Sequence, residues 1–301
     1  MVKVAVHGFI NVDLIGLIDG FADIDQEMEG KELQIAPGGS AANVAVGLSR
    51  LGEEVYFLGA VGEESYTSFL LNSLEKVKLD YIQRIQGKTS GTVMVLVNNS
   101  GLRTMYTFPG ANSHYDADLV PKAFYGNISL LHISSPLIHL APSLFRRKET
   151  CPDLQISFDP STLLTKKGLS FLEPLLSKTD ILFVNRSELN DMFPNRDLDQ
   201  SIQSLHALGV GKIFVKLGKE GALSSFITEG SSYHQLVLPS IKVNPVDSTG
   251  AGDAFAVGAL YGIIRNWSQE EILRAGIQLG ASAVSEVGAR KGLPHFLERE
   301  V

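Results

Sequence analysis

The stretch ILFVNRSEL, residues 181–189, decides the fold class that we expect for this chain. Its first four residues are apolar and fit a short buried strand, and polar residues follow at once, among them Asn185 and Glu188. An apolar strand followed by a helix-length segment recurs from Ser129 onward. This alternation predicts an α/β fold, a three-layer sandwich in which helices cover both faces of a mostly parallel central sheet. Ligands bind such sheets beyond the carboxyl ends of the strands.

Apolar patterns place the other elements along the chain. We expect parallel strands at 2–9, 54–62, 129–134, 154–160, 181–185 and 212–218, and a late antiparallel pair at 221–227 and 232–240. We expect helices at 38–52, 66–77, 168–178, 199–209, 252–266 and 269–288. A hairpin at 91–108, turning at Asn98–Gly101, interrupts the rhythm. With the extended stretch after Ile10, it predicts a small β lid built from about 11–36 and 90–111 on a single domain, 1–301.

Composition limits the class of protein. With 301 residues, 44% of them hydrophobic, the chain can fill a sizeable core, and its formal net charge of −7 argues against a nucleic-acid partner. The lone cysteine, Cys151, cannot form an internal disulfide, which favours a reducing compartment. No run of about 18 apolar residues occurs, so we expect no membrane partner. These features predict a cytoplasmic protein.

The segment VDSTGAGDAF, residues 246–255, carries the strongest chemical signal. Gly250, Ala251 and Gly252 leave backbone N–H groups unshielded at the start of an apolar helix, which makes an anion site. Asp253 lies in the first helical turn. Two interpretations of Asp253 remain open: a partner for the helix dipole, worth about 0.3–1 kcal/mol, or a general base beside an anion hole.

Two further segments follow expected strands. Oxygen side chains three apart in NRSEL, at Asn185 and Glu188, can orient the water shell of Mg²⁺. The alternative is a helix start, with Asn185 or Ser187 as the cap and Glu188 in the first turn. In INVD, Asn11 and Asp13 face the same way and can hold two neighbouring hydroxyls, whereas the alternative is an ordinary turn.

Two glycine-containing segments add candidates for binding. GGSAAN supplies bare backbone at Gly39 and an amide at Asn43; its alternative is a glycine turn with Asn43 on a helix surface. In VKLGKEGA, Gly218 and Gly221 let the backbone approach a flat or anionic ligand, although a plain hairpin has the same pattern. The chain has no P-loop pattern, no G-x-G-x-x-G after its first strand and no G-x-S-x-G elbow, and its histidines lack metal-ligand spacing.

These pieces, in this order, resemble the PfkB carbohydrate-kinase family, ribokinase type, over essentially the whole chain. GGSAANVAVGLSRLG resembles the family's amino-terminal signature, and VDSTGAGDAFAVGALYG resembles its more specific carboxyl-terminal signature. NRSEL is similar to the N-x-x-E motif, and VKLGKEG is similar to the strand that leads into the nucleotide loop. The resemblance implies a ribokinase-like fold and an ATP-dependent kinase that phosphorylates a hydroxyl of a sugar, nucleoside or polyol.

The resemblance also implies a role for each matching residue. Asp253 is the base, and Gly250, Ala251 and Gly252 form the anion hole for the transferred phosphoryl group. It implies that Asn185 and Glu188 organise Mg²⁺ with the ATP phosphates and that the nucleotide loop contains Lys216, Gly218 and Gly221. It also implies that the sugar hydroxyls bind to Asn11, Asp13, Gly39 and Asn43. A monovalent cation, with K⁺ as the candidate, would bind at Asp247 and Thr249.

Some features depart from the family pattern. Residues 63–65 are EES where many members have a short pattern with Asp, and SSPL, residues 134–137, lacks the carboxylate that ribokinases usually supply to the sugar. Ribose, nucleosides, inositol, fructose and other polyols therefore remain open, and Arg103 is either a solvated lid arginine or a contact for a phosphorylated sugar. A catalytically idle regulator that binds a sugar or nucleotide is the alternative function. Because an apolar lid edge often pairs with a second copy, we expect a homodimer.

Overall fold

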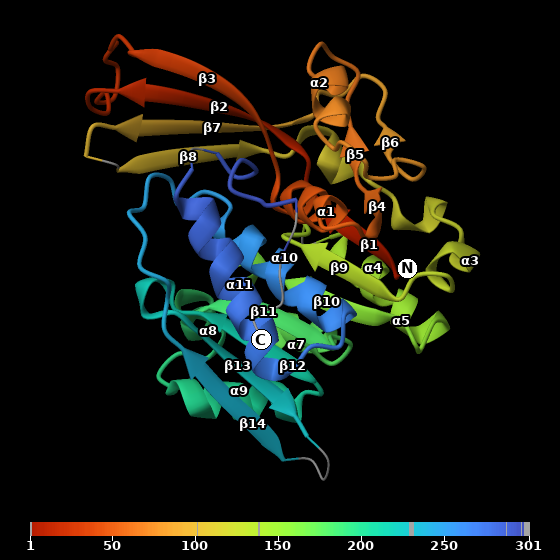
Figure 1. The fold of residues 1–301 in the computed structure, drawn as a ribbon. Helices are drawn as coiled ribbons and strands as arrows, with labels where there is room; N and C mark the ends of the chain where they lie inside the picture. The colour runs from red at the N-terminus through yellow and green to blue at the C-terminus, as the bar shows by residue number, and fades with distance from the viewer. Residues whose placement is uncertain are drawn as a thin grey trace.

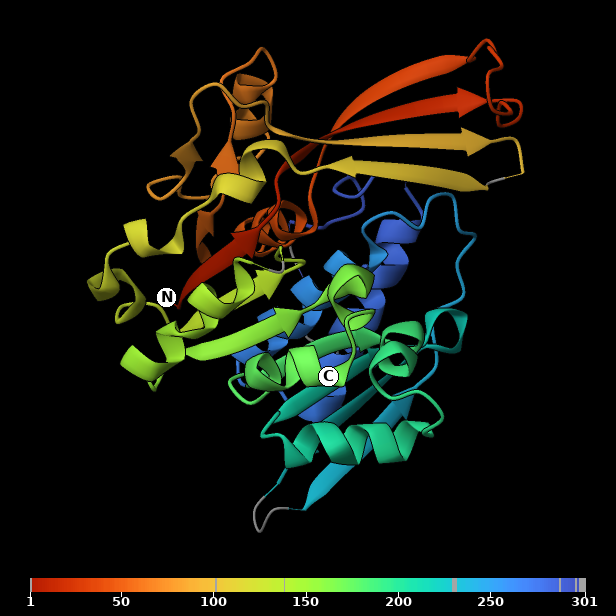
Figure 2. The same ribbon diagram turned by 180° about the vertical axis from the view of Figure 1, so that it is seen from behind.

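The computed structural model describes residues 2–297 except 101, 138, 229–231, 287 and 296. Figures 1 and 2 show a central sheet between two layers of helices, with a second sheet that projects from the body. The central sheet has the spatial order β14 (Tyr233–Leu238), β13 (Ala222–Ile227), β12 (Lys212–Lys216), β11 (Ile181–Asn185), β10 (Gln155–Asp159), β9 (Leu130–Ser134), β1 (Lys3–Gly8) and β4 (Glu54–Leu58). The pairs from β12 to β4 are parallel, and β13 pairs antiparallel with both neighbours.

Helices cover both faces of this sheet, as its apolar strands require. One face packs against α1 (Ser40–Arg50), α10 (Ala251–Ile264) and α11 (Gln269–Val284). The other face packs against α3 (Lys122–Tyr125), α4 (Ala141–Phe145), α6 (Ser161–Thr165), α7 (Leu169–Leu176), α8 (Arg186–Met192) and α9 (Leu198–Ala207). The remaining helical segments are α2 (Thr67–Asn72), α5 (Arg147–Thr150), η1 (Gly110–His114), η2 (Ala117–Leu119) and η3 (Gly218–Glu220). The expected α/β sandwich is confirmed.

Helix α10 is the buried centre of its layer. Residues 254–260 are all buried, and the helix packs against both α1 and α11. A helix that is apolar all round belongs in a core. Its first turn therefore has a fixed position at the edge of the central sheet.

The second sheet has the order β3 (Glu32–Gly38), β2 (Asn11–Ile18), β7 (Gly91–Asn98) and β8 (Arg103–Phe108). Strands β2 and β7 are parallel, and the other two pairs are antiparallel. The ranges expected for the lid, 11–36 and 90–111, contain β2, β7, β8 and most of β3, although residues 19–31 form a loop. This sheet projects above α11 in Figure 1. A third, two-stranded sheet consists of β5 (Ala60–Val61) and β6 (Gln83–Arg84), which follow β4 and precede β7 along the chain.

Several expected boundaries were wrong. The strand expected at 54–62 is interrupted at Gly59, where a Cβ would lie 2.5 Å from the ring of Phe57. The helix expected at 66–77 ends at Asn72. Strand β3, which contains Pro37, and the short helices of four or five residues were not foreseen, because periodicity needs a longer window. Within the described part of the chain, no helix is both long and apolar enough to span a bilayer.

Candidate active site

The carboxyl ends of five neighbouring strands meet along one edge of the central sheet. In the strand register, Gly8 lies beside Ser134, and Ser134 lies beside Asp159. Farther along the same edge, Asn185 lies beside Lys216. Parallel pairing thus gathers polar residues from distant parts of the chain at the edge where ligands bind.

Helix α10 begins at this edge with residues that have almost no side chains. Its N-cap, Gly250, has a left-handed φ of 77°, and a Cβ there would lie 2.5 Å from the Cβ of Ala289. The first N–H groups of a helix lack intrahelical partners and lie at the positive end of the helix dipole. The backbone from Gly250 to Gly252 therefore presents donors suited to an anion.

Asp253 lies half-buried in the first turn of α10. Its Oδ1 accepts a hydrogen bond from Ser40 Oγ at 2.5 Å, and its Oδ2 accepts one from Asn43 Nδ2 at 2.7 Å. Burial raises the pKa of the carboxyl group, and these two hydrogen bonds oppose the rise. A carboxylate with a raised pKa beside an anion site is suited to accept a proton from a bound hydroxyl.

Asn43 connects Asp253 to a buried arginine. Its Oδ1 accepts a hydrogen bond from Arg290 Nε at 2.8 Å, and Arg290 also donates to the carbonyl oxygens of Ser73 and Gly38. Burial lowers the pKa of Arg290 to about 10, so the guanidinium stays charged at neutral pH. Asn43 was expected at sugar hydroxyls, but both ends of its amide are engaged with protein groups, and one of these is the proposed base.

Asn11 and Asp13 lie on one face of β2, because they are two residues apart in a strand. Asn11 is buried, and its Oδ1 accepts a hydrogen bond from Asn112 Nδ2 at 3.0 Å. Asp13 Oδ1 is buried without a hydrogen-bond partner among the described residues. Burial raises the Asp13 pKa to about 6, against the favourable charge of Arg290. A buried oxygen without a partner, on a side chain that senses the charges of Arg290 and Asp253, is suited to accept a hydrogen bond from a ligand hydroxyl.

Gly38 and Gly39 allow a close approach of the backbone near Asp13. A Cβ at Gly38 would lie 2.1 Å from Asp13 Oδ2. Gly39, the N-cap of α1, has a φ of 97°, and a Cβ there would lie 2.2 Å from the carbonyl oxygen of Phe9. Gly38 and Gly39 therefore allow the end of β3 to pass beside Asp13 and α1 to begin directly after it.

Asn185 and Glu188 form the capping box of α8. Asn185 Oδ1 accepts from the Glu188 backbone N–H, and Glu188 Oε2 accepts from the Asn185 backbone N–H, both at 2.9 Å. The helix-start interpretation of NRSEL is thus confirmed. Glu188 is also buried, and both burial and the charge of Asp159 raise its pKa. A carboxyl group in this environment fits a cation, because a positive charge would relieve the repulsion between the two acids.

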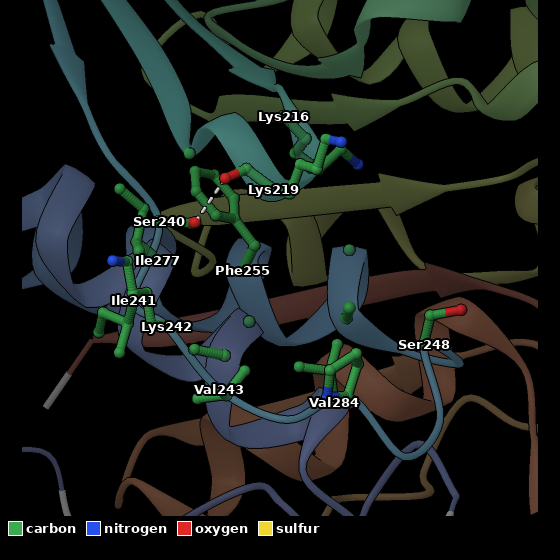
Figure 3. A pocket seen from close by; sticks show the side chains of 17 residues that line it. Lys216, Lys219, Ser240, Ile241, Lys242, Val243, Ser248, Phe255, Ile277 and Val284 are labelled. Atoms are coloured by element: carbon green, nitrogen blue, oxygen red, sulfur yellow. Dashed lines mark hydrogen bonds between the residues drawn. The ribbon is translucent and has the colours of Figure 1, made fainter.

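A cavity of about 720 Å³ lies between three parts of the chain, namely the end of β12, the 240–248 segment and the start of α10 (Figure 3). Its lining is largely apolar, with Phe255, Ile277 and Val284, and includes Gly218 and Gly221. A Cβ at Gly221 would lie 2.0 Å from the carbonyl oxygen of Leu238. A cavity of this size with a few polar groups suits a small-molecule ligand. Lys216, Ala251 and Gly252 line the cavity as well, so it reaches the first turn of α10.

Asp247 and Thr249 lie on the loop before α10. Asp247 accepts hydrogen bonds from the backbone N–H groups of Thr249 and Gly288, at 2.8 and 3.0 Å. Although burial opposes them, these bonds hold the Asp247 pKa below its usual value. Thr249 Oγ1 accepts a bond from Arg103 Nη1 at 3.3 Å. Arg103, in β8, thus joins the projecting sheet to the loop that carries the anion site.

With this geometry in place, comparison with known proteins decides the family. A model of the pfkB family of carbohydrate kinases matches residues 1–295. The chain belongs to this family. An uncharacterized sugar kinase from Archaeoglobus fulgidus is 32% identical to this family member over 257 residues, which cover 84% of this chain and 100% of the relative.

Solved ribokinase-type structures share the fold of this family member. The ribokinase of Arabidopsis thaliana, solved with ribose and ATP, has a TM-score of 0.85 at 23% identity and covers 98% of this chain and 96% of its own. A ribokinase II-like protein from E. coli, solved with ATP and Mg²⁺, has a TM-score of 0.84 at 23% identity, with coverages of 97% and 96%. The expected ribokinase-like fold and kinase class are confirmed.

Sequence reasoning missed four residues of the candidate site, which are Ser40, Ser134, Asp159 and Arg290. Ser40 Oγ lies 2.6 Å from Ser134 Oγ as well as beside Asp253. Two of these residues carried a signal, since Ser40 is in the GGSAAN motif and Asp159 ends a buried strand before a proline. Arg290 carried none, because it lies outside every motif and reaches the site only through the tertiary fold.

Proposed function

We propose that this kinase transfers the γ-phosphoryl group of ATP to a hydroxyl of a sugar, nucleoside or polyol. The observation that carries the proposal is the position of Asp253, which lies among the bare amides that begin α10, with a cavity to one side. In the reaction, the substrate oxygen forms a bond to the γ-phosphorus, and the bond from that phosphorus to the bridging oxygen of ADP breaks. Asp253 accepts the hydroxyl proton, and the N–H groups of residues 250–252 stabilise the charge on the transferred group.

The cavity beside Lys216 and Gly252 is the proposed ATP site. Gly218 and Gly221 let the loop after β12 lie against the nucleotide. Mg²⁺ supplies charge neutralisation for the phosphates when bound, and the buried Glu188, with Asn185, fits the role of orienting its water shell. Asp247, whose pKa is lowered, and Thr249 are the proposed groups for K⁺ near the anion hole.

The acceptor is proposed to bind between β2 and α1. The unpaired Oδ1 of Asp13 supports this position, since a substrate hydroxyl supplies the donor that the oxygen lacks. Asn11 and the backbone at Gly39 complete the proposed subsite. Asn43 has a different primary role in the proposal, because it holds Asp253 in place.

We also propose that the kinase is a cytoplasmic homodimer that pairs through the outer face of its projecting sheet. In the strand register, Leu14 pairs with Ile35 and with Met94, and Met94 pairs with Tyr106. These side chains lie on the face opposite Asp13, and Ile35, Met94 and Tyr106 are exposed. A contiguous exposed apolar face of this kind is typical of a protein interface.

The test of the proposed function is a panel of sugars, nucleosides and polyols assayed for ATP consumption and for a phosphorylated product. We expect at least one acceptor to be phosphorylated. The Asp253→Asn variant should melt near the wild-type temperature and lose about 10²–10⁴-fold in kcat, because the base is removed. The control is Asp199→Asn, at an exposed position of α9. If no acceptor stimulates ATP consumption, the catalytically idle alternative replaces the proposal; if Asp253→Asn is fully active, the assignment of the base is wrong.

A further inference from the structure

Lys216 lies where the proposed ATP cavity meets the first turn of α10. It is the last residue of β12 and pairs with Asn185 across the parallel register. A methyl group built at Gly252 would lie 3.3 Å from Lys216 Nζ. The ammonium group is therefore close to the amides of the anion site and not at the far end of the cavity. Figure 3 shows Lys216 together with Lys219, another lysine of the lining.

Acidic residues hold this ammonium in position. Lys216 Nζ donates to Asp159 Oδ2 at 2.8 Å, and the two side chains are only 18% and 12% exposed. Burial alone would lower the Lys216 pKa, but the charges of Asp159 and Glu188 outweigh it and raise the pKa above its ordinary value. Lys216 therefore stays an ammonium ion in a largely dehydrated place.

A fixed positive charge at this place has a use in phosphoryl transfer. Charge builds up on the oxygens of the transferred group and on the leaving oxygen, and preorganised positive groups stabilise it most where water is excluded. The bare amides of α10 supply only partial charges. Lys216 adds a full charge to these, beside that of the proposed Mg²⁺. Gly252 has no side chain that would separate Lys216 from the phosphoryl group.

We infer that Lys216 is a catalytic residue that contacts the transferring phosphoryl group, and that Asp159 is the residue that positions it. The inference rests on the proposed kinase function and deepens it. Lys219 and Lys242, which are exposed in the lining of the same cavity, have no such position and serve as matched controls.

The first experiment measures nucleotide binding by calorimetry, with no turnover. A contact to the terminal phosphoryl group predicts that Lys216→Met weakens the binding of a non-hydrolysable ATP analogue about tenfold more than the binding of ADP, which corresponds to about 1.4 kcal/mol. Lys219→Met and Lys242→Met should change both affinities equally. Equal losses for analogue and ADP in Lys216→Met would overturn the inference, since the lysine would then be a general nucleotide contact.

The second experiment measures kinetics with the best acceptor of the panel. We expect kcat of Lys216→Met to fall about 10²–10³-fold, as when one oxyanion donor is removed. Because this variant leaves Asp159 as an unpaired buried acid, the double variant Lys216→Met/Asp159→Asn is measured beside it. A double variant that folds and keeps wild-type kcat would overturn the inference while the proposed function stands. Wild-type protein that phosphorylates no acceptor would instead remove the proposed function.

The pH profile tests the positioning role of Asp159. In Asp159→Asn the lysine loses its largest favourable charge and keeps those of Glu188 and Asp253. Its pKa therefore falls, and the alkaline decline of kcat moves to lower pH. An alkaline limb that does not move, in a variant with reduced kcat, would show that Asp159 is only structural.

Discussion

At the scale of single residues, the site is defined by groups whose environments differ from those of an exposed side chain. Asp13 and Asp253 are both carboxyl groups with raised pKa, but their partners differ. Asp253 accepts two hydrogen bonds, whereas one oxygen of Asp13 has no partner among the described residues. An unpaired buried oxygen costs stability, and the proposed acceptor site gives this oxygen a hydrogen-bond donor.

The Asp13→Asn variant measures this cost and this use. The folded-state pKa of about 6 exceeds the ordinary 3.8, so the folded state binds the proton more tightly and wild-type stability falls as pH rises through that window. We expect Asp13→Asn to melt at a higher temperature than wild type above the window, with little difference below it, and to bind acceptor more weakly. The control is Asp23→Asn, in the exposed loop between β2 and β3. A variant with wild-type acceptor affinity would contradict the assignment of Asp13 to the subsite.

At the scale of elements, the N-terminus of α10 is the feature on which the proposed chemistry depends. Gly250 combines a left-handed φ of 77° with a neighbour, Ala289, that leaves no space for a Cβ. Gly52 has a φ of 91° and nothing within 4 Å of the corresponding position. A comparison of alanine variants at these two glycines therefore distinguishes the cost of backbone strain from the cost of steric contact.

We predict that Gly52→Ala loses about 1–2 kcal/mol of stability, the cost of the left-handed backbone alone. Gly250→Ala should lose more than this, and its kcat should fall, because the collision with Ala289 displaces the amides that form the anion hole. Thermal melts and steady-state kinetics of both variants check the prediction. If Gly250→Ala keeps the kcat of Gly52→Ala, the amides do not contribute to catalysis as proposed.

At the scale of the whole molecule, the projecting sheet has two faces with different surroundings. Its inner face carries Asp13 towards Arg290 and Asp253. Its edge strand β8 reaches the loop before α10 through the bond from Arg103 to Thr249. Its outer face is apolar and exposed, which the proposed homodimer would cover.

We predict that the wild-type protein elutes as a dimer and that Ile35→Glu combined with Tyr106→Glu gives a monomer, because buried charges without partners oppose association. Light scattering after size exclusion gives the mass of each species. Val237→Glu, at an exposed apolar position of β14, is the control and should leave the dimer intact. A monomeric wild type, or a double variant that remains dimeric, would rule out this interface.

The sequence by itself determined the parts of this protein that depend on local patterns. Apolar strands that alternate with helices gave the α/β class, because burial on both faces of a parallel sheet leaves a pattern in any short window. Bare backbone before a buried helix predicted the proposed anion site and Asp253 beside it, because a helix N-terminus has the same unpaired amides in every fold.

Only the tertiary structure decided which side chains surround Asp253. Ser40 and Asn43 reach Asp253 across 213 and 210 residues of chain, and Arg290 reaches Asn43 across 247. Contacts of this kind depend on strand order, on register and on the packing of α1 against α10, and no short window of sequence contains any of these. For the same reason, Asp159 acquires its partner Lys216 only when β10, β11 and β12 lie side by side.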